Sequence, residues 1–176
     1  MSKEATGQTR GSGLFLLRAL DAVTQTANVA GSCLIIGLVV LITADVLGRN
    51  LLGIPVAGVP EMVSLSIVAI VFLQAPQALL AGRLTRSDGI INLLLLRAPR
   101  IAAILETVFD LMSTAVMLAI LYSHWPILIR SYERGDFVGA TGNFTAPTWP
   151  VKAMLAIGAT LLALQFLARI LRRFSQ

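Results

Sequence analysis

Four long apolar runs divide the chain, at about residues 27–48, 60–82, 102–127 and 150–170. A helix needs about 20 mostly apolar residues to cross the roughly 30 Å hydrocarbon core of a membrane, and each run is long enough. The stretch 62–82 contains no charged residue. The pattern predicts an all-α integral membrane protein, with a single four-helix domain over residues 1–176.

Two shorter segments have a mixed pattern. Residues 14–22 are apolar but interrupted by Arg18 and Asp21, so we expect a retained amphipathic lead-in at the membrane surface rather than a cleaved signal peptide. Between the second and third runs, "DGIINLLLLRAPR" is apolar over too few residues to cross a membrane. It predicts an interfacial helix or a tight connection.

Composition agrees with a membrane protein: 56% of residues are hydrophobic and 13% are charged, against about 25% charged in soluble domains. The net charge is +5, but the basic residues lie between apolar runs and are not interleaved with aromatic residues. This placement argues against nucleic-acid binding.

The positions of lysine and arginine predict the orientation. Ten of the 14 lie before the first run, between the second and third, or at or beyond the end of the fourth: Lys3, Arg10, Arg18, Arg83, Arg86, Arg97, Arg100, Arg169, Arg172 and Arg173. Cytoplasmic loops carry the excess of these residues, so we expect both termini in the cytoplasm. Trp149 and Pro150 would then begin the last span at the outer interface.

Few residues suggest chemistry. His124 is the one histidine, which rules out a haem held by two histidines of this chain. Cys33 is the one cysteine, so an internal disulfide or a cysteine metal cluster is ruled out. The sequence contains no phosphate-binding loop and no nucleophile with a paired base at a known spacing. We therefore expect neither catalysis nor a bound cofactor or metal.

Several polar residues near or within the spans have a structural interpretation. Asp45 and Arg49 are four apart and can pair, and Glu61 lies in the first turn of a span, where a carboxylate is favoured. Gln74 and Gln77 fall on one helix face with Ser66. This face indicates packing against protein, although a solute path is an open alternative.

In "ILETVFDLM", Glu106 and Asp110 are four residues apart on one helix face. Acids inside a span are costly and mark either an ion path or a paired site. We favour an ion-pair seam with nearby arginines over a sodium site, with Asp110 the deeper acid. The expected arginine partners are Arg83, Arg86, Arg97 and Arg100.

The stretch "ADVLGRNLLGIPVAGVPEMVSLSIVAIVFLQAPQALLAGRLTRSDG" resembles the small membrane subunit, DctQ-like, of tripartite ATP-independent periplasmic (TRAP) transporters. The likeness extends over about residues 25–172. The residues that match the family pattern are Asp45, Val46, Arg49, Glu61, Phe72, Arg83, Arg86, Asp88, Trp149 and Pro150.

The resemblance implies a multi-pass protein of the bacterial inner membrane that supports a larger membrane subunit. That large subunit would hold the substrate and sodium sites, and a periplasmic binding protein would deliver an organic acid. Lipids would be the remaining partner. The candidates for subunit contacts or structural roles are Asp45, Arg49, Glu61, Gln74, Gln77, Arg86, Asp88, Glu106, Asp110, Trp149 and Pro150.

Three other functions are open from the sequence. One is the small subunit of a tripartite tricarboxylate transporter, and a second is a haem-free membrane anchor of a respiratory enzyme. A third is a small channel or exporter that uses Glu106, Asp110 or Asp45 as its ion site.

Overall fold

The computed structural model describes residues 4–83, 98–140 and 144–174. Its elements are α1 (Glu4–Leu47), the π-helical η1 (Gly48–Leu52), α2 (Val59–Leu80), α4 (Pro99–Arg134), β1 (Phe137–Ala140), β2 (Phe144–Pro147) and α5 (Trp149–Phe174). Four helices within these residues are long and apolar enough to cross a membrane. The expectation of four helices long and apolar enough to span a membrane is therefore confirmed.

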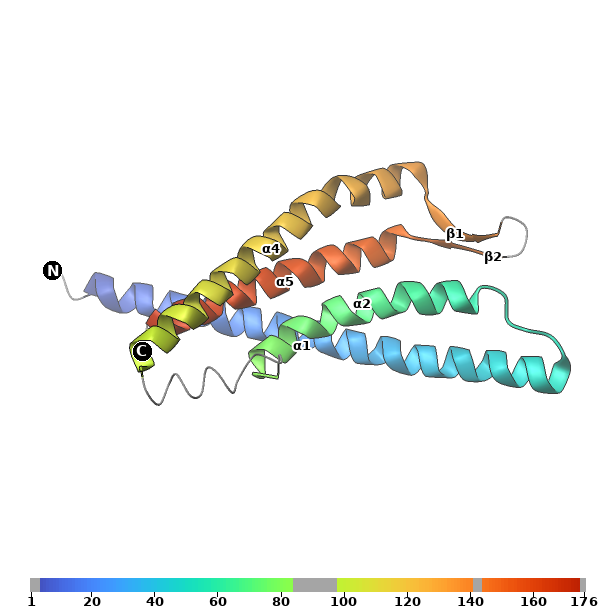
Figure 1. The fold of residues 1–176 in the computed structure, drawn as a ribbon, viewed down its shortest axis with the longest axis horizontal. Helices are drawn as coiled ribbons and strands as arrows, with labels where there is room; N and C mark the ends of the chain where they lie inside the picture. The colour runs from blue at the N-terminus through green and yellow to red at the C-terminus, as the bar shows by residue number, and fades with distance from the viewer. Residues whose placement is uncertain (1–3, 84–97, 141–143, 175–176) are drawn as a thin grey trace.

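The helices run up and down in sequence order (Figure 1). The α1–α2 connection and the β-hairpin lie at one end of the molecule, and the start of α1 and the end of α5 lie toward the other. Helix α5 contacts both α4 and α2, and α2 also contacts α1. Over its most apolar window, 56% of α5 is buried, against 6% of α4. Helix α5 is thus the central helix of the fold.

Helices α2 and α5 approach each other closely at a glycine. A β-carbon added at Gly158 would overlap the carbonyl oxygen of Phe72. This carbonyl lies four residues before Pro76, which is buried inside α2 and has no N–H to donate to it. The proline and the glycine together let α5 lie directly against the α2 backbone.

Beside this crossing, the small hydrophobic core consists of Leu79, Leu162 and Phe166, with Ala75 and Met117 packed against it. Small side chains on α5, Ala156, Ala159 and Ala163, are buried. Small residues allow helices to approach closely in a membrane. The core therefore lies along α5 and joins it to α2 and α4.

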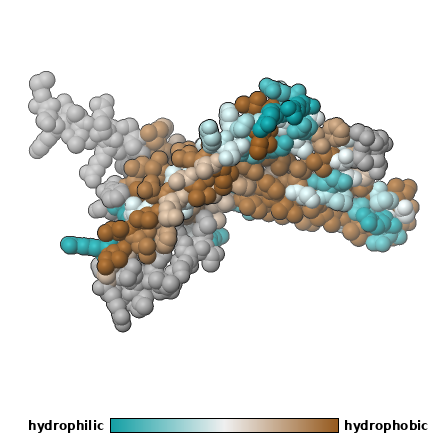
Figure 2. Space-filling view, turned by 45° about the horizontal axis from the view of Figure 1, so that its top comes forward, coloured by the Kyte–Doolittle hydropathy of each residue, from teal (hydrophilic) through white to brown (hydrophobic). Residues whose placement is uncertain are grey.

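Large apolar side chains on α1 and α4 point outward. Exposed examples are Ile36, Val39, Val40, Ile104, Leu111 and Leu118. Figure 2 shows hydrophobic residues over the middle of the visible face and hydrophilic ones gathered toward the ends of the molecule. This distribution suits a protein whose middle is surrounded by lipid or by another membrane subunit.

The expectation of a separate lead-in at residues 14–22 is wrong. Helix α1 runs without a break from Glu4 to Leu47, so the segment continues directly into the first span. Within this segment, Asp21 pairs with Arg172 of α5, 2.7 Å away, and so ties this part of α1 to the bundle. The second short segment, 88–100, falls largely outside the described residues.

The loop between α4 and α5 also differs from expectation. Helix α4 continues seven residues past the predicted end at residue 127, to Arg134. An antiparallel hairpin, which the sequence reading did not predict, follows, with Val138 opposite Ala146. Its strand residue Phe144 lies against Gly58 (φ 81°), where any β-carbon would overlap the ring. The hairpin therefore rests on the α1–α2 connection.

Candidate functional site: an ion-pair cluster and a capped loop

The last two turns of α5 carry three arginines whose side chains reach two different helices. Arg172 Nη2 donates to both carboxylate oxygens of Asp21 on α1, at 2.7 and 2.8 Å. Gln165 Nε2 donates to Asp21 Oδ1 at 3.2 Å and to Thr24 Oγ1 at 2.9 Å. Thr24 and Gln165 are both buried. These contacts fix the first half of α1 to α5.

Arg173 binds the opposite neighbour, α4. Its guanidinium donates to Glu106 Oε2 at 2.6 Å and to Thr107 Oγ1 at 2.9 Å. Asp110 Oδ2 lies 3.7 Å from Arg173 Nη2 and 3.9 Å from Arg169 Nε. The Asp110 side chain is fully buried, whereas that of Glu106 keeps 22% exposure.

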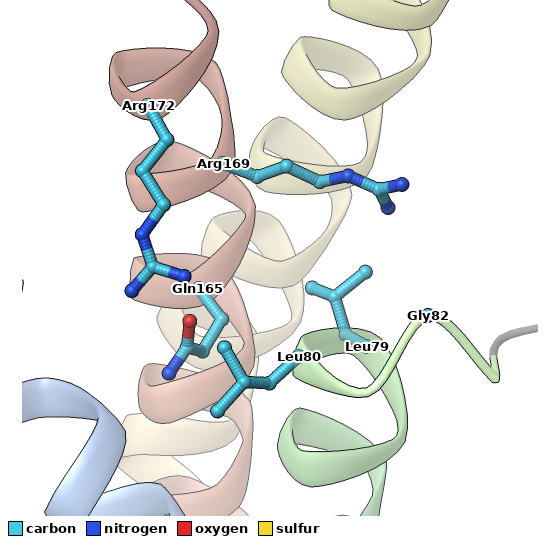
Figure 3. Close-up of a pocket in the computed structure, with 6 residues that line it drawn as sticks. All are labelled: Leu79, Leu80, Gly82, Gln165, Arg169 and Arg172. Carbon is cyan, nitrogen blue, oxygen red and sulfur yellow. The ribbon is translucent and has the colours of Figure 1, made fainter. Parts of the chain in front are cut away.

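We call these residues the ion-pair cluster: Asp21, Glu106, Asp110, Arg169, Arg172 and Arg173. Three acids balance three arginines, so the cluster is formally neutral. In Figure 3, Arg169 and Arg172 leave α5 in different directions, and Leu79 and Leu80 of α2 lie below them. These residues, with Gln165 and Gly82, line a small cavity of about 110 Å³. The cluster connects α1, α4 and α5 beside the end of α2.

Among the described residues, Glu106 and Asp110 pair with arginines that the sequence did not indicate. We expected Arg83, Arg86, Arg97 and Arg100, which are near in sequence, but Arg173 and Arg169 of α5 hold the two acids. Arg86 and Arg97 lie outside the described residues. The physical reason is the antiparallel packing of α4 and α5, which places the start of one helix beside the end of the other.

At the other end of the molecule, Asp45 closes the α1–α2 connection. Its Oδ2 accepts a hydrogen bond from Arg49 Nη2 and its Oδ1 one from the Val56 N–H, both at 2.8 Å. Asp45 is 7% exposed, while the Arg49 side chain is 61% exposed. The spacing of Asp45 and Arg49 predicted the pair, but no local pattern indicated the bond to Val56. Glu61 lies half-buried in the first turn of α2.

The start of α5 is bound to the end of α4. The rings of Trp149 and Tyr132 meet edge to face, with centroids 5.6 Å apart. Ser131 and Thr148 share a buried hydrogen bond at 2.9 Å, and Pro150 lies in the first turn of α5. Trp149 is thus held by α4, in addition to any role at the membrane interface.

The polar stripe of α2 faces α1. The Gln74 side chain packs against Gly31, where a β-carbon would lie 2.9 Å from Gln74 Cγ. Gln74 and Gln77 line a cavity with Asn28 of α1. Ser66, on the same stripe, is half-buried. Asp88, another matched residue, lies outside the described part of the chain.

Sequence reasoning missed Thr24, Gln165 and Gly158 as structural residues. Each acts through a partner on another helix, more than 80 residues away in the chain. Arg169, Arg172 and Arg173 were used only to orient the chain. Arginines on one face near a helix end, opposite acids on another helix, are the signal that could have identified them.

Comparisons with known proteins give one match. The family model described as "Tripartite ATP-independent periplasmic transporters, DctQ component" matches residues 38–176. The matched region includes α2, α4, the hairpin, α5 and the last part of α1. No curated protein and no solved structure matches the chain. Because the family model matches more than half of the sequence, this chain belongs to the DctQ component family of TRAP transporters.

Proposed function

We propose that this chain is the scaffold subunit of a sodium-coupled TRAP transporter for an organic acid. The observation that carries the proposal is the ion-pair cluster, in which Asp21, Glu106 and Asp110 pair with arginines of the same chain. Carboxylates held by cations at short distance are poorly suited to take up and release a sodium ion. The acids therefore brace the helices.

Members of this family act with a large membrane subunit and a periplasmic binding protein, and the family is one of transporter components rather than enzymes. The exposed apolar faces of α1 and α4 are our candidates for the surface that packs on the large subunit. Sodium coupling and an organic-acid substrate come from the family resemblance, and both would reside in the partner proteins.

We infer that both termini face the cytoplasm, because most lysines and arginines fall on the terminal side of the spans. The hairpin, the α1–α2 connection, Arg49 and Glu61 would then lie on the periplasmic side, within reach of the binding protein. Asp136, which pairs with Lys152 at 3.4 Å, lies in this region, as does Glu133, which is exposed.

The family match favours this function over the three alternatives raised by the sequence. A channel that used Asp45, Glu106 or Asp110 as its ion site would have to break the pairs that now hold these acids. A subunit of a tricarboxylate transporter, or an anchor of a respiratory enzyme, would co-purify with a partner other than a TRAP large subunit.

Affinity purification tests the assembly. When the tagged chain is expressed with its large subunit and purified in mild detergent, we expect a stable complex that contains both chains. Mass spectrometry of the purified sample identifies the partner. A respiratory enzyme, or the chain alone despite good expression of the large subunit, would contradict the proposal.

A further inference from the structure

A second cavity, separate from the ion-pair cluster, lies between α1 and α2 at the end of α2. Its volume is about 290 Å³, and its lining residues are Asn28, Gln74, Gln77, Ala78, Ala81 and Arg83. A water molecule occupies about 30 Å³ of liquid, so the cavity could hold a group of about ten non-hydrogen atoms. Three side-chain amides and one guanidinium make it strongly polar for a membrane helix pair.

The cavity contains an unsatisfied acceptor. Among the described residues, Oε1 of Gln77 is buried and accepts no hydrogen bond. A buried polar atom without a partner costs about 1–3 kcal/mol. A ligand that brings a hydrogen-bond donor to Gln77 would remove this cost.

The end of α2 holds Arg83 at the mouth of the cavity. Gly82 adopts the left-handed conformation, with φ 67°. The Gly82 N–H bonds to the Leu79 carbonyl at 3.1 Å, and the Arg83 N–H bonds to the Ala78 carbonyl at 2.9 Å. This is the two-bond pattern of a Schellman cap, which fixes the backbone of the residue after the glycine. The Arg83 side chain therefore extends from a fixed backbone position at the end of α2.

The charge of the cavity favours an anion. Arg83 is the one charged residue among the six that line it, and none of the six is a carboxylate. Arg83 is exposed, as expected for a residue at the level of the lipid headgroups. Guanidinium groups bind phosphate through charge-assisted hydrogen bonds, and basic pockets between membrane helices are known to take phospholipid headgroups.

The depth of the cavity suits a lipid headgroup with its ester groups. Along a helix that rises about 1.5 Å per residue, Gln74 lies roughly 10 Å from Ala81. The headgroup and interfacial layer of one leaflet is about 5–8 Å deep. Gln74 therefore lies just below this layer, where its side-chain amide and that of Asn28 could donate to the ester carbonyls of a lipid whose phosphate lies beside Arg83.

We propose that this cavity binds one glycerophospholipid whose headgroup carries a hydrogen-bond donor. Arg83 holds the phosphate, a headgroup donor folded back into the cavity donates to Gln77 Oε1, and the amides of Gln74 and Asn28 bind the ester region. The lipid fills the groove between α1 and α2 and stabilises the helix pair. The site does not depend on the proposed transport function.

Lipid binding is measured on the full-length chain, purified in dodecyl maltoside and stripped of lipid. Dihexanoyl phosphatidylglycerol has a phosphate and hydroxyl donors, and we expect it to raise the thermal unfolding midpoint saturably. Dihexanoyl phosphatidylcholine has the phosphate without a donor and should bind more weakly. Inorganic phosphate should give a much smaller shift, because it lacks the ester groups. A full shift with phosphate alone would point to a simple anion site and overturn the proposal.

Point variants test whether phosphatidylglycerol binds in this cavity. Arg83→Gln is expected to weaken phosphatidylglycerol binding about tenfold, the effect of losing one charged hydrogen bond. The matched control is Arg134→Gln, which removes an exposed arginine at the end of α4 and should bind as the wild type does. Equal affinity in wild type, Arg83→Gln and Arg134→Gln would contradict the site.

Gln77→Leu gives a readout that does not depend on Arg83. It removes the unsatisfied acceptor, so its midpoint without lipid should equal or exceed that of the wild type, while the stabilisation by phosphatidylglycerol should fall. A lower midpoint without lipid would mean that Gln77 already has a partner, and it would refute the proposal. Native mass spectrometry should also find less co-purified phospholipid on this variant.

Discussion

Asp110→Asn is expected to lower the free energy of unfolding by about 3 kcal/mol, the low end of the range for breaking a buried ion pair. The side chain is fully buried and lies 3.7 Å from Arg173 and 3.9 Å from Arg169. The substitution leaves these two arginines with one fewer carboxylate. The loss stays at the low end because Glu106 still binds Arg173 at 2.6 Å.

The measurement is thermal or SDS-induced unfolding of the chain in detergent, together with the yield of the complex. Glu106→Gln should cost less, about 1 kcal/mol, because the amide oxygen can still accept a bond from Arg173. Glu133→Gln removes an exposed acid at the other end of α4 and serves as the neutral control.

The same variant distinguishes a structural role of Asp110 from a role in binding a sodium ion. If Asp110 is structural, the surviving Asp110→Asn complex keeps the sodium dependence of the wild type. A changed sodium dependence would instead give Asp110 a part in ion coupling, and it would reverse our interpretation of the ion-pair cluster.

Gly158→Ala is expected to destabilise the chain by about 1–3 kcal/mol, the usual cost of overfilling a packed interior. The added β-carbon would overlap the Phe72 carbonyl oxygen and lie 2.8 Å from Phe72 Cβ. Since backbone atoms of α2 have little room to retreat, α5 must move away from the Pro76 region. Gly158→Leu should prevent a stable fold.

The matched control for Gly158 is Gly37→Ala on α1. A β-carbon at Gly37 meets nothing within 4 Å, and alanine favours a helix over glycine by up to about 1 kcal/mol. The isolated chain should therefore be unchanged or slightly more stable. Equal loss in both variants would show that the α2–α5 crossing is not specially close.

The number and order of the spans could be predicted from the sequence because each depends on local hydrophobicity. Asp45 and Arg49 could also be paired, since their spacing of four lies on one helix face. Helix ends were less accurate: α4 runs to Arg134 rather than to residue 127. Hydrophobicity marks where a membrane begins, but a helix can continue into water.

Contacts between distant segments could not be predicted in the same way. Arg173 and Glu106 are 67 residues apart, and Gln165 and Thr24 are 141 apart. Which residues meet depends on the rotation and depth of each helix against its neighbour, and these are set by small residues such as Gly158. The sequence contains the residues of the ion-pair cluster but does not indicate which acid pairs with which arginine.

The central claim is that this chain supports the transporter but does not itself carry the solute. Solute uptake into proteoliposomes tests it most directly. Vesicles contain this chain alone, the large subunit alone or both, with the binding protein and radiolabelled organic acid outside and an inward sodium gradient. We expect uptake only when both membrane chains are present. Sodium-driven uptake by this chain alone would contradict the account.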